Sequence, residues 1–267
     1  MRFETLLYDV ADGVATLTLN RPERHNAFNL TMAGELRQAW EEVKRDPEVV
    51  CVILTGAGEK AFCTGMDVGD VASGDATRKT GRVPREEAPW FQLTAIHNRC
   101  WKPVVTAVNG MTCGGGLHFI ADADLIVCAE HATFFDTHVK VGLIAGLEPV
   151  GLARRIPLEA VLRMAFLGGS ERMNAQEAKE IGLVGEVLPA DRVMPRAREL
   201  AAKIAQHSPT SLARTKQCIW ESLDVGLDQA IDDTWKAIQE HADCPDLKEG
   251  AKAFVAKRKP RWAPYTG

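Results

Sequence analysis

The sequence predicts an α/β fold with largely parallel strands, and three observations carry this prediction. Continuous apolar runs at 49–54, 103–108 and 125–128 are typical of strands that are covered on both faces. Helix-like segments at 86–101 and around 116–121 precede the second and the third of these runs. Strands that alternate with helices in this way usually join one parallel sheet.

The N-terminal part is predicted to form a hairpin followed by a helix. Two β-rich runs within residues 3–20 flank Asp12-Gly13, which is a strong signal for a tight hairpin turn. Over residues 30–45, apolar side chains recur at the spacing of an amphipathic helix. Together they supply one edge of the predicted sheet and its first covering helix.

Beyond these elements the pattern changes twice. Segment 69–89 is rich in Gly, Pro and charged residues, as expected for a surface loop of the kind that often forms a lid or binding loop. The C-terminal part contains only helix-like segments, at 195–206, 210–223, 226–241 and 246–258. We therefore expect a core over 1–195 and a helical docking or oligomerisation region over 196–267.

Composition excludes several classes of protein. The chain has 267 residues, 46% of them hydrophobic, and a formal net charge of -4, so it is not a disordered segment. Its Lys and Arg residues are scattered, which argues against a nucleic-acid partner, and it lacks the run of about 18 apolar residues that crosses a membrane. Seven Cys without a CxxC pair indicate neither a disulfide framework nor a zinc ribbon. With no signal-peptide-like start, a cytoplasmic location is expected.

Two glycine-containing turns carry the chemistry. The sequences AFCTGMDV (61–68) and NGMTCGGGLH (109–118) each follow a predicted buried strand. Glycine lets backbone N–H groups approach a ligand, and a glycine run that opens a helix directs free N–H groups at an anion. Each turn alone is more often only a tight turn. Together they can supply two donors to one carbonyl oxygen, which is an oxyanion hole.

With these motifs in place, the chain resembles the crotonase, or enoyl-CoA hydratase/isomerase, superfamily over nearly its whole length. NRPERHNA (20–27) is similar to the coenzyme A segment of the family, 168–184 to a later conserved stretch, and 249–260 to its C-terminal helix. The resemblance implies a crotonase-like ββα spiral core with a helical region that builds trimers, which often pair into hexamers. It also implies acyl-CoA chemistry through an enolate.

The resemblance further implies roles for particular residues. The backbone N–H groups of Met66 and Gly115 correspond to the two oxyanion donors. The coenzyme A part of the substrate is expected at Arg24, Ala27, Ala61, Thr64, Asp67, Phe254 and Lys257. Lys257 would meet a phosphate within its subunit or across a subunit boundary, although it also fits a solvated basic helix end. No tightly bound cofactor and no metal are implied.

The sequence departs from the family at both acid/base positions. Family hydratases carry a Glu three residues after the middle Gly of the triplet and another twenty residues later, where this chain has His118 and His138. Two imidazoles can move protons, because the ordinary pKa of histidine is about 6.5. They can also favour C–C cleavage, hydrolysis or decarboxylation of a 3-oxo or malonyl-type thioester. In the third interpretation they only line a pocket that binds acyl-CoA without turnover.

Other ionisable residues have two readings each. Glu148 stands near a predicted helix start, where it supplies the missing carboxylate or, as we favour, only complements the helix dipole. Asp136 can likewise be interpreted either as the missing catalytic carboxylate or as a residue with only a structural role. His97 precedes a buried strand, and core packing is the simpler reading for it. A metal site at the two histidines lacks an evident third ligand.

Overall fold

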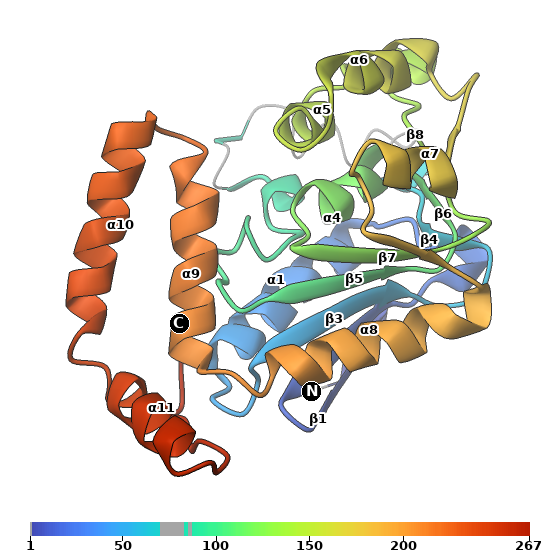
Figure 1. The fold of residues 1–267 in the computed structure, drawn as a ribbon. Coiled ribbons are helices and arrows are strands. Elements are labelled where there is room, and N and C mark those ends of the chain that lie inside the picture. The colour runs from blue at the N-terminus through green and yellow to red at the C-terminus, as the bar shows by residue number, and fades with distance from the viewer. Residues whose placement is uncertain (1, 70–82, 85–86) are drawn as a thin grey trace.

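The computed structural model describes residues 2–69, 83–84 and 87–267, and it forms two β-sheets with helices around them (Figure 1). The larger sheet has the order β1-β2-β3-β5-β7-β10, with strands Leu6–Ala11, Val14–Leu19, Cys51–Gly56, Val104–Val108, Leu125–Ala129 and Glu186–Leu188. Only its β1–β2 pair is antiparallel. The smaller sheet has the order β4-β6-β8-β9, with strands Ala61–Cys63, Met111–Cys113, Thr133–Phe135 and Met173–Asn174. The predicted α/β class is confirmed.

The N-terminal hairpin and first helix form where the sequence predicted them. Asp12 and Gly13 have φ values of 51° and 78°, the left-handed conformation that a two-residue hairpin turn requires. Helix α1 spans Leu30–Arg45, and the Asn29 side chain accepts a hydrogen bond from the backbone N–H of Met32 to cap its start. Its apolar face is fully buried against the large sheet.

The helix predicted over 86–101 is wrong for the described residues, which form turns and one short 3-10 helix. Side chains take the places of backbone partners there. The indole of Trp40 donates to the carbonyl of Leu93, which a helix would pair with the N–H of His97. That N–H instead donates to the hydroxyl of Thr94. Local side-chain bonds of this kind compete with helix formation.

Short helical elements surround the smaller sheet. The 3-10 helices are η1 (Pro22–Arg24), η3 (Pro89–Phe91), η4 (Gly114–Leu117) and η5 (Val139–Val141). The α-helices are α4 (His118–Ala121), α5 (Leu147–Leu152), α6 (Leu158–Leu167) and α7 (Ala175–Glu180). The helix expected around 116–121 is thus present as η4 and α4. Most of the loop expected at 69–89 lies outside the described residues.

Four helices complete the chain: α8 (Ala190–Ile204), α9 (Pro209–Ser222), α10 (Leu227–His241) and α11 (Pro245–Val255). Helix α8 lies along one face of the large sheet and buries Val193, Ala197 and Ala201 there (Figure 1). The boundary expected between 195 and 196 therefore falls inside a continuous helix, since the apolar face of α8 belongs to the sheet core.

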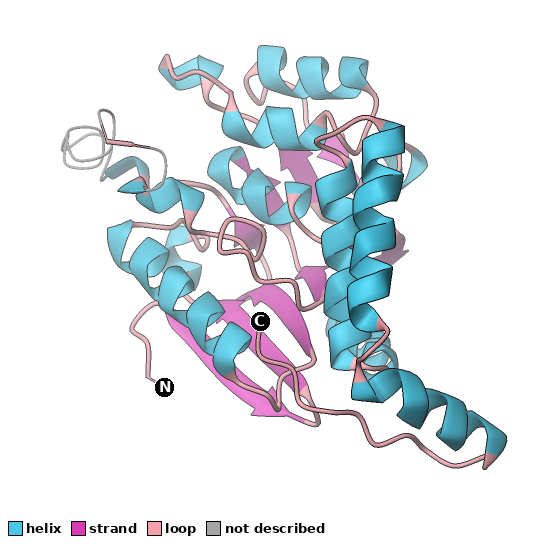
Figure 2. Ribbon diagram, turned by 90° about the vertical axis from the view of Figure 1, so that its left-hand side faces the viewer, coloured by secondary structure: helices cyan, strands magenta, loops and turns pink. Residues whose placement is uncertain are grey.

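The helices that follow α8 do not lie along a face of the large sheet, although α9 contacts the start of β7 through the 2.7 Å ion pair of Lys216 with Asp124. Figure 2, viewed from the side of α10, shows α9 and α10 running side by side at the edge of the molecule. Among the residues that the structure describes, no helix is both long and apolar enough to span a bilayer.

Candidate active site

The two glycine-containing turns are brought into direct backbone contact. Strands β4 and β6 pair in parallel, which aligns the turns that follow them. Gly65 has φ of +85°, and a Cβ atom placed on it would lie 2.7 Å from the backbone nitrogen of Gly115. A Cβ atom placed on Gly115 would lie 2.6 Å from Cζ of Phe28. Only glycine fits at these two positions, because the neighbouring atoms leave no room for a side chain.

The backbone pairing of Phe28 with residues 65–67 sets the direction of the Met66 N–H group. Phe28 donates to the carbonyl of Gly65 over 2.8 Å and accepts from the N–H of Asp67 over 2.9 Å. This is the pattern of a parallel bridge centred on Phe28 and Met66, so the N–H of Met66 points away from Phe28. The N–H of Gly115 belongs to the first turn of η4, whose donors have no acceptor within the helix.

His118 begins α4 directly after the glycine run, and its side chain is only 6% exposed. Its Nε2 lies 3.1 Å from Oε1 of Glu148, whose side chain is equally buried. Glu148 is the second residue of α5, far from His118 in the sequence. The packing of α5 against α4 is what brings the carboxylate to the imidazole.

The Glu148 carboxylate stands between two imidazoles, since His138 Nε2 lies 3.9 Å from the same Oε1 atom. Burial alone would raise the pKa of Glu148, but the hydrogen bond from His118 and the charges of His118 and His138 lower it to about 2. The sequence favoured a role at the helix dipole. The structure instead places the side chain in the centre of a three-residue cluster.

His138 is held by a buried aspartate. Its Nδ1 lies 3.0 Å from each carboxylate oxygen of Asp136, and its backbone N–H donates to Oδ1 over 2.7 Å. Asp136 is fully buried, and its hydrogen bond to the ring raises the pKa of His138, although burial opposes this shift. A Cβ atom placed on Gly114 would lie 3.8 Å from Cε1 of His138, so the ring borders the glycine run.

A second aspartate stands behind His118. Asp122 follows α4, and its carboxylate accepts from the Thr94 hydroxyl over 2.6 Å and lies 3.4 Å from Nε2 of His97. The ring of His97 packs edge-on to that of His118, with centroids 5.2 Å apart. Sequence reasoning missed Asp122 and treated His97 as core. The four-residue step from His118 to Asp122, which places both on one helix face, was the available signal.

Five of the residues expected to contact coenzyme A lie on segment 20–27 and on 61–67, and these two segments contact each other. Buried Asn26 connects them, because its amide donates to the carbonyl of Ala61 and also to that of Ala57. Arg21 donates to the carbonyl of Ala27 and forms a 3.0 Å ion pair with Asp67. The remaining two of the five are Arg24, exposed in η1, and Thr64, whose hydroxyl donates to the carbonyl of His25.

A hollow of about 290 Å³ opens next to this segment. Its walls come from the segment itself and from the turn after β3, and they are formed by Pro22, His25, Asn26, Ala57, Gly58, Glu59, Lys60 and Ala61. The hollow therefore lies at the start of strand β4, which begins at Ala61, and the first glycine turn follows the end of that strand.

The other two expected residues lie far from this cluster within one chain. Phe254 is 86% exposed near the end of α11, and Lys257 follows that helix with φ of +50°. Figure 1 places α11 at the opposite end of the molecule from β4 and β6. The two residues do not join the coenzyme A segment of their own chain.

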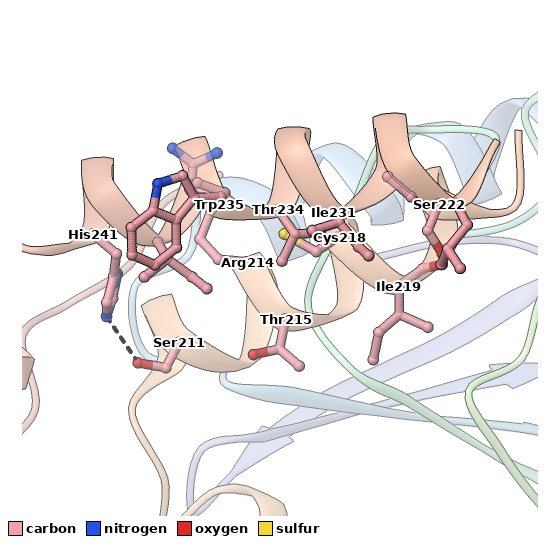
Figure 3. Close-up of a pocket in the computed structure, with 14 residues that line it drawn as sticks. Ser211, Arg214, Thr215, Cys218, Ile219, Ser222, Ile231, Thr234, Trp235 and His241 are labelled. Carbon is pink, nitrogen blue, oxygen red and sulfur yellow. Dashed lines mark hydrogen bonds between the residues drawn. The ribbon is translucent and has the colours of Figure 1, made fainter. Parts of the chain in front are cut away.

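A long groove separates α9 from α10 (Figure 3). It encloses about 570 Å³, and its walls are mainly apolar. Ile219, Ile231 and Trp235 are more than half exposed there. Within residues 2–69, 83–84 and 87–267, no three His, Cys, Asp or Glu side chains are arranged to hold a metal ion.

The family model and the related sequences that match this chain point to the same family. Residues 9–264 match the model of the enoyl-CoA hydratase/isomerase family. The (E)-benzylidenesuccinyl-CoA hydratase of Thauera aromatica is 36% identical over 94% of this chain and 96% of its own. The 1,2-epoxyphenylacetyl-CoA isomerase of Escherichia coli K12 is 33% identical over 97% of this chain and 98% of its own.

Solved structures agree in fold. An enoyl-CoA hydratase/isomerase from Mycobacterium paratuberculosis superposes with a TM-score of 0.89 at 38% identity, covering 98% of this chain and 99% of that one. An enoyl-CoA hydratase from Bacillus anthracis superposes with a TM-score of 0.88 at 29% identity, covering 97% and 99%. The chain therefore belongs to the enoyl-CoA hydratase/isomerase family of acyl-CoA enzymes and has the crotonase fold.

Proposed function

We propose that this chain adds water across the double bond of a 2-enoyl-CoA thioester, with Glu148, His118 and His138 replacing the two glutamates of the family hydratases. The observation that carries the proposal is the Glu148 carboxylate, which lies 3.1 Å and 3.9 Å from the two imidazoles. A base and an acid are thus held within reach of each other beside the two glycine turns. Their opposite pKa shifts fit two different roles.

The backbone N–H groups of Met66 and Gly115 bind the thioester oxygen in this proposal. Negative charge collects on that oxygen when a nucleophile adds at Cβ, and two fixed donors stabilise it. Removal of one such donor typically costs about 10²- to 10³-fold in rate. The close approach of Gly65 to Gly115 supports the role, because it holds the two donors on one side of a rigid junction.

The proton transfers then follow from the charges. The Glu148 carboxylate removes a proton from water as the hydroxyl adds to Cβ, and the His138 imidazolium gives a proton to Cα of the enolate. Transfer of the proton from Glu148 to His138 restores both groups. His118 donates through Nε2 to Glu148, which orients the carboxylate and keeps it ionised. Water is consumed and no other reagent is needed.

A second candidate is C–C hydrolysis or decarboxylation of a 3-oxo or malonyl-type CoA thioester. The raised pKa of His138 favours it, because an imidazolium beside the glycine run stabilises by charge the enolate that both reactions release, after water adds to the Cβ carbonyl in hydrolysis or after CO₂ leaves in decarboxylation. Binding without turnover is the remaining alternative.

One panel of thioesters, followed by mass spectrometry, separates the three. It contains crotonyl-CoA, a longer enoyl-CoA, an aryl-substituted enoyl-CoA and a 3-oxo and a malonyl-type CoA. A mass gain of one water on the enoyl substrates supports hydration. Conversion of only the 3-oxo or malonyl substrates would replace it with the second candidate, and tight binding without conversion would leave a binding protein.

We also propose that the coenzyme A moiety lies along 20–27, with its nucleotide near Arg24, and that three copies assemble through α9 and α10. The apolar groove of Figure 3 supports the assembly, since exposed surfaces of this kind commonly mark subunit contacts. Assembly would also give Phe254 and Lys257 a second subunit to meet. Sedimentation velocity of wild type and of Trp235→Glu tests it, because a buried charge would dissociate the trimer.

A further inference from the structure

Helix α4 is a single turn that carries His118 at its start and ends at Asp122. The N–H of Asp122 donates to the carbonyl of His118 over 3.1 Å, so the two residues are rigidly connected. The Asp122 carboxylate holds the irregular segment opposite, through the Thr94 hydroxyl at 2.6 Å and His97 Nε2 at 3.4 Å. One buried side chain therefore fixes His97 against the turn that bears His118.

The ring of His118 is confined on two sides. On one side the His97 ring packs edge-on, with centroids 5.2 Å apart and planes inclined by 75°. On the other, Nε2 meets Oε1 of Glu148 at 3.1 Å. Rotation of the ring by half a turn about χ2 would take Nε2 away from Glu148 and would have to pass the His97 ring that packs against it.

We propose that Asp122 and His97 are positioning residues, which lock the His118 ring with its proton on Nε2 facing Glu148. The site then contains a continuous row of contacts in the order Asp122, His97, His118, Glu148, His138 and Asp136, in which every contact except the ring contact of His97 with His118 joins an imidazole to a carboxylate. The consequence for the reaction rests on the proposed function, because it acts through the Glu148 base. The orientation of the ring does not depend on which thioester is the substrate.

Several charged groups face this pair and set its pH dependence. Burial raises the pKa of Asp122, while the Thr94 hydrogen bond and the charges of His118, Lys216 and Arg155 oppose the shift. Arg155 reaches the turn itself, where it donates to the carbonyl of Ala121 over 3.1 Å. Lys216 is neutralised by Asp124 at 2.7 Å. From α5, Glu148 faces His118 directly, with His138 beyond it.

The test uses two substitutions of different kinds in the full-length protein. Asp122→Asn keeps the shape of the side chain and an acceptor for Thr94, but removes the charge that holds His97. His97→Phe keeps a ring against His118 but removes the contact with Asp122. We expect kcat to fall about tenfold to a hundredfold, with KM changed less than about twofold, because part of the general acid–base contribution is lost. Thr94→Val should act in the same direction and less strongly.

A readout without substrate distinguishes orientation from mere stability. Nitrogen-detected NMR of the histidine rings reports which nitrogen of His118 carries the proton. We expect the Nε2-protonated form in wild type, a mixture of tautomers in Asp122→Asn, and a displaced pH–kcat profile. His207→Gln, an exposed histidine of the C-terminal region, is the control that should change neither.

The proposal is overturned if both variants fold and leave the His118 tautomer and kcat at wild-type values. It is equally overturned if kcat falls only in proportion to lost folded protein while the tautomer is unchanged. If wild type converts no enoyl-CoA, the proposed function fails, but the NMR comparison still decides whether Asp122 and His97 orient His118.

Discussion

The two halves of the site are built in different ways. The proposed donor half, at Gly65–Met66 and Gly114–Gly116, consists of backbone, and its atoms approach so closely that no side chain fits at Gly65, Gly115 or Gly116. The acid/base half consists of side chains from three separate elements, on α4, before η5 and on α5. The first half is inseparable from the fold. The second depends on side chains, which can be exchanged while the fold persists, and this is how one architecture can serve several reactions.

The largest effect is expected at the donor half. Gly115→Ala places a methyl group only 2.6 Å from Cζ of Phe28, so Phe28 or the turn must move. We expect a rate loss of about 10²- to 10³-fold as the donor shifts, as for removal of an oxyanion donor. The clash should also lower the free energy of unfolding by about 1–3 kcal/mol. Steady-state kinetics and chemical denaturation measure the two effects.

Gly34→Ala is the matched control, because no atom lies within 4 Å of the Cβ position in the middle of α1. There the same change should raise the free energy of unfolding by about 0.5–1 kcal/mol and leave the rate alone. Wild-type kinetics in Gly115→Ala would contradict the difference between the two halves, since the donor half would then tolerate a side chain.

Glu148→Gln is expected to have the next largest effect. The amide keeps the shape of the side chain but cannot take a proton, so kcat should fall by about 10²- to 10⁴-fold with a smaller change in KM. The variant should remain folded and should bind acyl-CoA, as isothermal titration can check. An unchanged kcat would remove Glu148 from the chemistry and return the site to its two histidines alone.

The two glycine turns of the proposed donor half could be found in the sequence because their signal is local. Gly65 and the run 114–116 are glycines because the close backbone approach at these turns requires them, and the N-terminal hairpin was marked by a local pattern too. The same holds for α1 and the parallel strands. Each of these predictions required only the period of apolar residues and a turn residue at its end.

The acid/base half was only partly predictable, for a physical reason. His118 and His138 were found at fixed spacings, but Glu148 reaches them only because α5 packs on α4, and such tertiary contacts leave no mark in a short window of sequence. The incorrect helix over 86–101 has the same origin. Its carbonyl at Leu93 is taken by Trp40, a residue of α1 far away in the chain.

A smaller effect is expected at the aspartate beside His138. Asp136→Asn removes the charged acceptor whose hydrogen bond and charge raise the pKa of His138, so that only the charge of Glu148 still opposes the lowering of this pKa by burial. The proposed acid is the imidazolium, so activity is lost as pH rises through that pKa, and the alkaline limb of the pH–kcat profile should move to lower pH. Glu148 stays ionised far below this limb, since its pKa is about 2. An alkaline limb at the wild-type position would show that another group donates the proton.

The smallest effect is expected at α11, which lies outside both halves of its own site. Lys257→Gln should raise KM for the thioester by at most about fivefold and leave kcat unchanged, because an exposed charge pair contributes only about 0.2–1 kcal/mol. Lys259→Gln, two residues on in the same basic stretch, is the control and should do less. Raised salt should erase the difference between the two variants. If this difference in KM is present in the assembled trimer and vanishes in the Trp235→Glu background, the phosphate contact crosses a subunit boundary. A difference of equal size in monomers would place the contact within one chain. Equal KM values for the two variants would show that the basic stretch after α11 does not bind coenzyme A.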